Sequence, residues 1–177
     1  GLQQMIDKYL VKNRNTGEIY ETPQFAYVLI AMCLFSSIQS VKKAYDSYST
    51  FKVNLPTPIM AGVRTNIKQF ASCVLVDVDD TLESIFSSIH AVGKYTARRA
   101  GIGLNVGRVR PINSSIRGGE VVHTGIIPYL KIFESAVKAT SQNGVRGGGG
   151  TVYIPWWHYE IEDVLVLKNN AGTDDNR

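Results

Sequence analysis

Cys73 is the residue of this sequence best placed to do chemistry. It lies in the apolar run 70–78, with the hydroxyl of Ser72 beside it and three aspartates between residues 77 and 80. A thiol in such a place can do acid–base and redox work, whereas a cysteine inside an apolar run is by default a small buried hydrophobe. Ligand sites of α/β proteins lie where strands end and helices begin. The position of Cys73 therefore favours a chemical role, and a purely structural role as a buried cysteine stays open.

A second candidate site is rich in arginine. Arg108, Arg110 and Arg117 surround the hydroxyl-bearing segment 111–116. Guanidinium groups present planar forks of donors that suit a phosphate group, although solvated surface arginines are the alternative. Further along, Arg146 precedes four consecutive glycines. Such a segment is expected to move and to become ordered on a ligand or partner.

Regular elements must position these groups. The run 70–78 has the length and the β-branched content of a strand buried on both faces. Apolar residues at helical spacing follow from Leu82 onward. Asp80 and Glu83 have the spacing of a capping box, which predicts Asp80 as the N-cap of this helix. This pattern leaves open whether Asp80 is only a helix cap or also takes part in a site.

The pattern after residue 55 alternates between strands and helices. Strands are predicted at 70–78, near 101–105 and at 151–154, with helices after residue 82, over 124–141 and over 159–167. The helix over 124–141 is predicted to have Thr124 as its cap and Leu130, Phe133 and Val137 on its inner face. Such alternation is typical of parallel strands in an α/β layer or barrel with right-handed crossovers.

Three helices are predicted before the first strand, over 2–11, 23–35 and 40–51. Thr22 and Pro23 read as the N-cap and first residue of the second helix, which is apolar nearly all round and therefore predicted to be buried, with Cys33 in the core. Two prolines in the segment 55–62 predict an extended chain with Thr57 as an exposed hydroxyl. We therefore expect a helical approach segment over 1–54 and a second domain over 55–177.

Composition limits the class of protein. The chain has 177 residues, 44% of them hydrophobic, and a net charge of 19 − 15 = +4. The basic residues are spread along the chain, which suits small anionic ligands at least as well as nucleic acid. Two cysteines make no disulfide framework or zinc pattern, and no apolar run is long enough for a membrane span. The sequence starts with glycine, and we expect it to be a segment of a larger protein.

Ordered motifs then narrow the family. They are LPTPIMAGVRT at 55–65, QFASCVL at 69–75, RAGIG at 99–103, IRGGE at 116–120, HTG at 123–125, VRGG at 145–148 and LVLKNN at 165–170. Together they resemble the catalytic large subunit of class I ribonucleotide reductase, of the bacterial and phage type, over nearly the whole chain. The resemblance implies a ten-stranded α/β barrel, of which this chain would hold the approach helices and the first strands.

The resemblance also implies roles at the ribose. Cys73 would be one of two redox cysteines that reduce the 2′ carbon and finish as a disulfide, with the partner cysteine outside this chain. Thr57, Ser72 and Gly101 would contact the substrate.

A specificity site for a deoxynucleoside triphosphate effector is implied as well. Its expected residues are Asp80, Thr81, Leu82, Arg110, Ile116 and Arg117. The deoxyribose would meet Asp80, and the phosphates would meet Arg110 and Arg117. Gln142 and Arg146 would belong to the loop that carries the identity of the effector to the substrate base.

The implied partners complete the expectation. The substrate would be a ribonucleoside diphosphate, the effectors deoxynucleotides or ATP, and the radical would come from a di-metal small subunit, with no metal or other cofactor held by this chain. The resemblance further implies a homodimer through the effector-site helices, a thioredoxin- or glutaredoxin-type reductant and a cytoplasmic location. Neither nucleic acid nor a membrane is expected as a partner. The alternatives are a cobalamin-dependent (class II) reductase and a non-catalytic nucleotide-binding fragment.

Overall fold

The computed structural model describes residues 1–13, 15–66, 68–141 and 148–167. Its contacts divide the chain into two compact units, residues 1–72 and 73–177. The sequence predicted a domain boundary between residues 54 and 55, and that boundary stays a prediction for the domains of the protein.

The first unit is helical, as expected. Its elements are α1 (Leu2–Gln4), the π-helical turn η1 (Met5–Tyr9), α2 (Pro23–Leu34), α3 (Ile38–Ser49) and α4 (Thr57–Gly62). The Thr22 side chain accepts a hydrogen bond from the Phe25 amide and Pro23 opens α2, so the predicted cap is confirmed. A proline suits this place because amides of the first turn have no partner within the helix.

Helix α2 is buried on one face only, so the prediction that it is buried all round is wrong. Ile30 and Ala31 pack in one cluster with Ala44 and Tyr48 of α3 and Met60 of α4. Its other face stays exposed, and this includes Cys33, which was predicted to lie in the core. Apolar composition all round a helix does not tell how many neighbours it has, and here the described unit supplies neighbours for one face.

Helix α4 replaces the extended segment that two prolines predicted. Pro56 occupies the N-cap with extended backbone, and Pro58 lies in the first turn. The amides that these prolines lack are ones that a helix start leaves unpaired in any case, so both fit. Thr57 is half-buried rather than an exposed hydroxyl.

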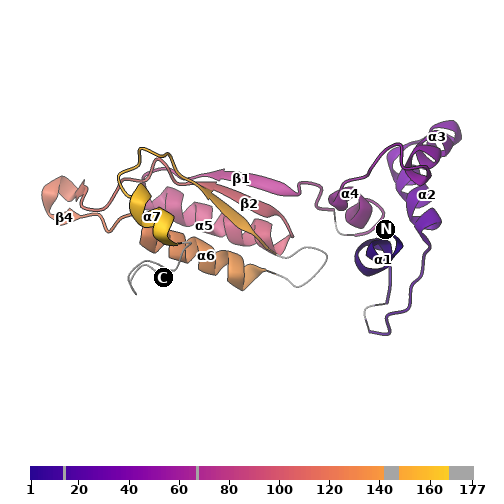
Figure 1. The fold of residues 1–177 in the computed structure, drawn as a ribbon, viewed down its shortest axis with the longest axis horizontal. Coiled ribbons are helices and arrows are strands. Elements are labelled where there is room, and N and C mark those ends of the chain that lie inside the picture. The colour runs from indigo at the N-terminus through magenta and orange to yellow at the C-terminus, as the bar shows by residue number, and fades with distance from the viewer. Residues whose placement is uncertain (14, 67, 142–147, 168–177) are drawn as a thin grey trace. The chain divides into compact units, whose positions relative to one another are not determined.

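The second unit is an α/β layer. Its larger elements are β1 (Cys73–Asp77), α5 (Leu82–Ala97), β2 (Gly101–Asn105), α6 (Ile127–Thr140), β5 (Gly150–Tyr153) and α7 (Ile161–Leu167). The strands form one parallel sheet in the order β1-β2-β5, and α5 and α6 run side by side along one face of it (Figure 1). The predicted parallel alternation is confirmed. In the described residues the sheet is open and three-stranded, so neither a closed barrel nor ten strands are observed.

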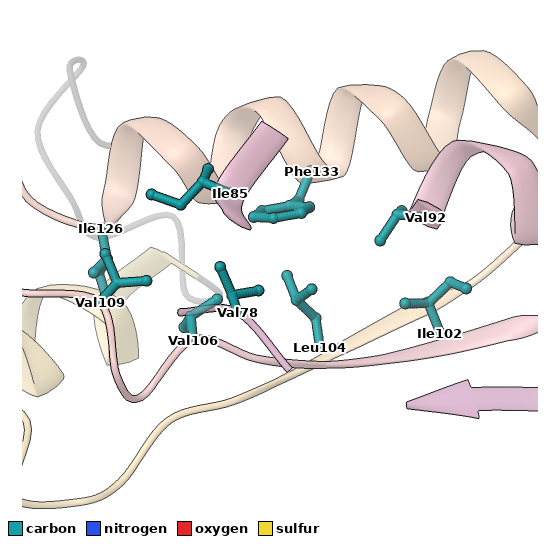
Figure 2. Packing of buried hydrophobic residues seen from close by; sticks show 9 residues of the cluster. All are labelled: Val78, Ile85, Val92, Ile102, Leu104, Val106, Val109, Ile126 and Phe133. Carbon is teal, nitrogen blue, oxygen red and sulfur yellow. The ribbon is translucent and has the colours of Figure 1, made fainter. Parts of the chain in front are cut away.

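A single apolar core joins the sheet to the two helices. Figure 2 shows its nine buried residues, Val78, Ile85, Val92, Ile102, Leu104, Val106, Val109, Ile126 and Phe133. Leu130 and Val137 of α6 pack against it as predicted. The predicted cap Thr124 is wrong, because α6 begins at Ile127 with Ile126 at the N-cap position.

A small antiparallel hairpin, which the sequence did not predict, projects between β2 and α6. It consists of β3 (Ser115–Ile116), the 3₁₀ turn η2 (Arg117–Gly119) and β4 (Val121–Val122). Arg117 and Gly118 both have positive φ, which makes the tight reversal. This hairpin carries two of the expected effector residues.

Candidate functional site

The sheet has an open face, which we define as the face turned away from α5 and α6. Because side chains alternate along a strand, Val74 and Val76 of β1 pack toward the core while Cys73, Leu75 and Asp77 lie on the open face and are exposed. Leu75 is 79% exposed. The prediction that this strand is buried on both faces is therefore wrong, because the two helices cover one face only.

Cys73 and Gly101 are brought together by the register of the sheet. They are direct partners across the parallel pair β1-β2, so they lie on the same face of neighbouring strands. Two of the expected site residues thus come from different parts of the sequence to one place, with Cys73 exposed. Ser72 precedes Cys73 at the end of the first unit and is half-buried.

A hollow of about 1030 Å³ lies along the same open face. Its lining includes Leu75, Asp77, Gly103, Asn105, Arg108 and Tyr153. A Cβ at Gly103 would stand 2.5 Å from Leu75 Cδ2 and 3.1 Å from Tyr153 Cε2. A side chain at this position would therefore have to displace the exposed end of Leu75, where the side chains of β1 and β5 approach each other across β2.

Arg108 belongs to this open-face hollow, and its partners are carboxylates. It donates to Asp79 at 3.0 Å and pairs with Asp77 at 3.3 Å, while Asn105 donates to Asp77 at 2.7 Å. The hydrogen bond to Asp79 and the charges of Asp77 and Asp79 raise the pKa of the Arg108 guanidinium above its ordinary value. Arg108 is thus already paired with two aspartates that follow or end β1, which the phosphate interpretation of the three arginines did not include.

The second candidate site lies at the start of α5. Thr81 caps this helix, and its hydroxyl accepts from the Ser84 amide at 3.1 Å. The predicted Asp80 cap is therefore wrong by one residue. Asp80 instead accepts from the Arg110 amide at 2.9 Å and from Arg110 Nε at 2.7 Å.

Arg110 connects this helix start to the hairpin. Its Nη1 donates to the Ser115 carbonyl at 3.3 Å, next to Ile116 in β3. Arg117 is exposed in the hairpin turn, and Leu82 is exposed at the first position of α5. The structure thus joins Asp80, which directly precedes Thr81 and Leu82, to Arg110 and the base of the hairpin. Arg117 lies on the same hairpin.

The hydroxyl of Thr57 has a defined partner in the first unit. Tyr9 Oη and Thr57 Oγ1 are 3.0 Å apart. The Tyr9 carbonyl accepts from Arg64 Nη2 at 2.9 Å, and Arg64 forms a buried ion pair with Glu21. Sequence patterns missed this arrangement, because its members are 43 to 55 residues apart.

Gln142 and Arg146 of the expected specificity loop lie outside the described residues. Within the described residues, no group of three or more His, Cys, Asp or Glu side chains is gathered as a metal site. Every helix in the same part of the chain is too short or too polar to span a membrane.

Fold and sites together define a parallel α/β domain with an exposed cysteine on its open face and an Asp–Arg pair at a helix start beside a hairpin. Comparison with known families gives two matches, to the barrel domain of ribonucleotide reductase over residues 71–177 and to its all-alpha domain over residues 1–68. The chain belongs to the ribonucleotide reductase large-subunit family.

Similar proteins agree with the family. The chain is 56% identical over 99% of its length to ribonucleoside-diphosphate reductase 1 subunit alpha of Escherichia coli. It is 56% identical to the corresponding subunit alpha of Haemophilus influenzae over 99% of its length, and 50% identical to that of Enterobacteria phage T4 over 100%. It spans 24% of the length of each of these relatives.

Proposed function

We propose that this chain is part of the catalytic large subunit of a class I ribonucleoside-diphosphate reductase of the bacterial and phage type. The observation that carries the proposal is Cys73, exposed on the open face of the sheet and paired in register with Gly101, in a chain of this family. The names of the similar subunits support a diphosphate substrate and the two-subunit kind of enzyme over the cobalamin-dependent kind.

The proposed reaction replaces the 2′ hydroxyl of a ribonucleotide by hydrogen. Two cysteine thiols become one disulfide, the 2′ C–O bond breaks, a C–H bond forms, and the hydroxyl leaves as water. Cys73 supplies one thiol of the pair and a second cysteine of the family's redox pair supplies the other. Thiolate character and access govern such chemistry, and the exposed position of Cys73 gives that access.

Substrate contacts are proposed at Thr57, Ser72 and Gly101. Gly101 lies next to Cys73 and has no side chain, so a sugar can approach the backbone there. The hydroxyl of Thr57 can donate to a phosphate oxygen while it accepts from Tyr9 Oη, since a hydroxyl has one donor and two acceptor positions.

The effector site is proposed at Asp80, Thr81, Leu82, Arg110, Ile116 and Arg117, with Gln142 and Arg146 in the specificity loop. Arg110 has five N–H groups on its guanidinium. The bonds to Asp80 and Ser115 use two of them, so others can face the phosphates of a deoxynucleotide. Asp80 keeps acceptor lone pairs for a deoxyribose hydroxyl.

The remaining partners follow from the class of enzyme. A di-metal small subunit supplies the radical, a thioredoxin- or glutaredoxin-type protein reduces the disulfide, and two large subunits associate through the effector-site helices. Deoxynucleotides or ATP are the effectors. A reducing compartment, the cytoplasm, suits a disulfide that must be reduced after each turnover.

The test compares two serine substitutions in the subunit at its natural full length. Cys73→Ser is expected to abolish turnover that is driven by the dithiol protein reductant. Cys33→Ser, at the exposed cysteine of α2, is the matched control and is expected to keep it. Full activity of Cys73→Ser would show that the assigned role is wrong, and turnover that depends on cobalamin instead of a small subunit would favour the class II alternative.

A further inference from the structure

Glu160 is a buried carboxylate to which the function proposed above assigns no role. It lies just before α7 and is only 3% exposed. Its Oε2 accepts from the Ile112 amide at 2.9 Å, and both of its carboxylate oxygens accept from the Ile126 amide, at 3.2 and 3.1 Å. Burial of a carboxylate is costly unless hydrogen bonds compensate it, so this contact is a specific one.

The two amides come from opposite ends of the hairpin segment. Ile112 precedes β3 and Ile126 follows β4, and within the segment His123 N donates to the Ser114 carbonyl at 2.8 Å. The hairpin thus closes through its own stem, and Glu160 binds the base of that stem to the rest of the domain.

Gly125 is required for this contact. Its φ of +90° is in the left-handed region, and a Cβ at this position would overlap Glu160 Oε1. The Gly125 amide donates to His123 Nδ1 at 3.1 Å. The backbone is therefore shaped around the carboxylate.

His158 fixes the backbone on the N-terminal side of Arg110. The Glu160 amide donates to His158 Nδ1 at 3.2 Å, so Nδ1 is the acceptor and the proton is on Nε2, which donates to the Val109 carbonyl at 3.1 Å. Val109 and Ile112 are thus both fixed from the segment 158–160, and Arg110 lies between them. The Arg110 side chain reaches Asp80 from this fixed backbone.

We propose that Glu160, with His158, positions Arg110 and the hairpin for the deoxynucleotide effector. The inference rests on the proposed function and adds to it two residues that need not touch the effector. Preorganised donors bind a ligand more tightly, because less ordering is needed at the moment of binding. Loss of the Glu160 contacts should therefore weaken effector binding and leave intact the turnover that a saturated effector site supports.

The test uses the subunit at its natural full length and dTTP as the probe. Glu160→Gln keeps the shape of the side chain but replaces one acceptor oxygen by an N–H donor that faces backbone amides. Its Kd for dTTP is expected to rise about tenfold, the size of one charge-assisted hydrogen bond. Glu162→Gln, the same change at an exposed position two residues away, is the control and should bind dTTP as the wild type does.

Two further measurements separate positioning from general damage. Turnover at saturating dTTP should equal that of the wild type, and exchange of the Ile112 and Ile126 amides should be faster. His158→Gln, which disturbs the bond to Val109, gives an independent variant if Glu160→Gln folds poorly, with an expected rise in Kd of about threefold.

The outcomes are distinct. An unchanged dTTP affinity in variants that keep their fold overturns the inference and leaves the effector site standing. A loss of turnover even at saturating dTTP also overturns the inference, because Glu160 would then act on a step other than effector binding. If the wild type itself binds neither dTTP nor other deoxynucleotides, the proposed effector site fails and this inference fails with it.

Discussion

The buried ion pair of the first unit offers the sharpest test of how that unit holds Thr57. Arg64 pairs with Glu21, and the two side chains are 3% and 6% exposed. The guanidinium also donates to the carbonyls of Met60 and Tyr9, and Glu21 accepts from the Val11 amide at 2.8 Å. One arginine therefore joins η1, the segment before α2, and α4.

The perturbation is Arg64→Met, which keeps an unbranched side chain of similar reach and removes the charge and all donors. Glu21 then keeps the Val11 amide as a donor but loses its cation. Removing one partner of a buried pair costs about 3–5 kcal/mol, because the other charge stays buried without compensation. At about 1.4 kcal/mol per factor of ten, the unit should open between about a hundredfold and a few thousandfold more often.

Hydrogen exchange of the full chain is the appropriate assay, because two compact units need not unfold together. Protection of amides within residues 1–72 should fall by this factor, while that of β1, β2 and α5 stays unchanged. Lys52→Met, at an exposed position of the same unit, is the control.

The double variant Glu21→Gln with Arg64→Met tests the cause. Glutamine keeps an acceptor for the Val11 amide and brings no charge, so part of the protection should return. If Arg64→Met loses less than about 1 kcal/mol, or if the double variant is as unstable as the sum of the single ones, the reasoning about a buried uncompensated charge is refuted.

Three further substitutions test the proposed sites. Tyr9→Phe removes the hydroxyl that bonds Thr57 and should raise KM for the ribonucleoside diphosphate several-fold with kcat nearly unchanged; an unchanged KM would mean that Tyr9 does not orient Thr57. Thr81→Ala removes the cap of α5 and should cost about 1 kcal/mol of stability in urea unfolding. Compared with Thr81→Ala, Asp80→Asn should have a smaller effect on stability and a larger one on dTTP affinity. The opposite result would indicate that Asp80, and not Thr81, is the cap of α5.

Local patterns in the sequence predicted several local features correctly, although the caps at Asp80 and Thr124 were wrong. The Thr22–Pro23 cap, the inner face of α6 and the alternation that leads to parallel strands all depend on residues within a few positions of one another. Motifs in order along the chain also identified the family, since they need no knowledge of contacts.

The wrong predictions for the segment 55–62 and for the burial of the two apolar runs share a physical cause. A proline at residue 56 or 58 is equally at home in an extended chain and at a helix start, and only the burial of Met60 in the helical cluster distinguishes the two. Cys33 and Cys73 lie in apolar runs, but which face of an element is covered depends on neighbours that the run itself does not specify.

The sequence by itself determined the family, the periodicity of the elements and the presence of a cysteine at a strand in the second unit. Only the tertiary structure decided which side chains meet: Asp80 with Arg110 across 30 residues, Ile112 with Glu160 across 48, and Tyr9 with Thr57 across 48. Hydrogen bonds of this kind require the donor and acceptor atoms to lie about 3 Å apart. Packing of distant elements sets that placement, and no local spacing in the sequence encodes it.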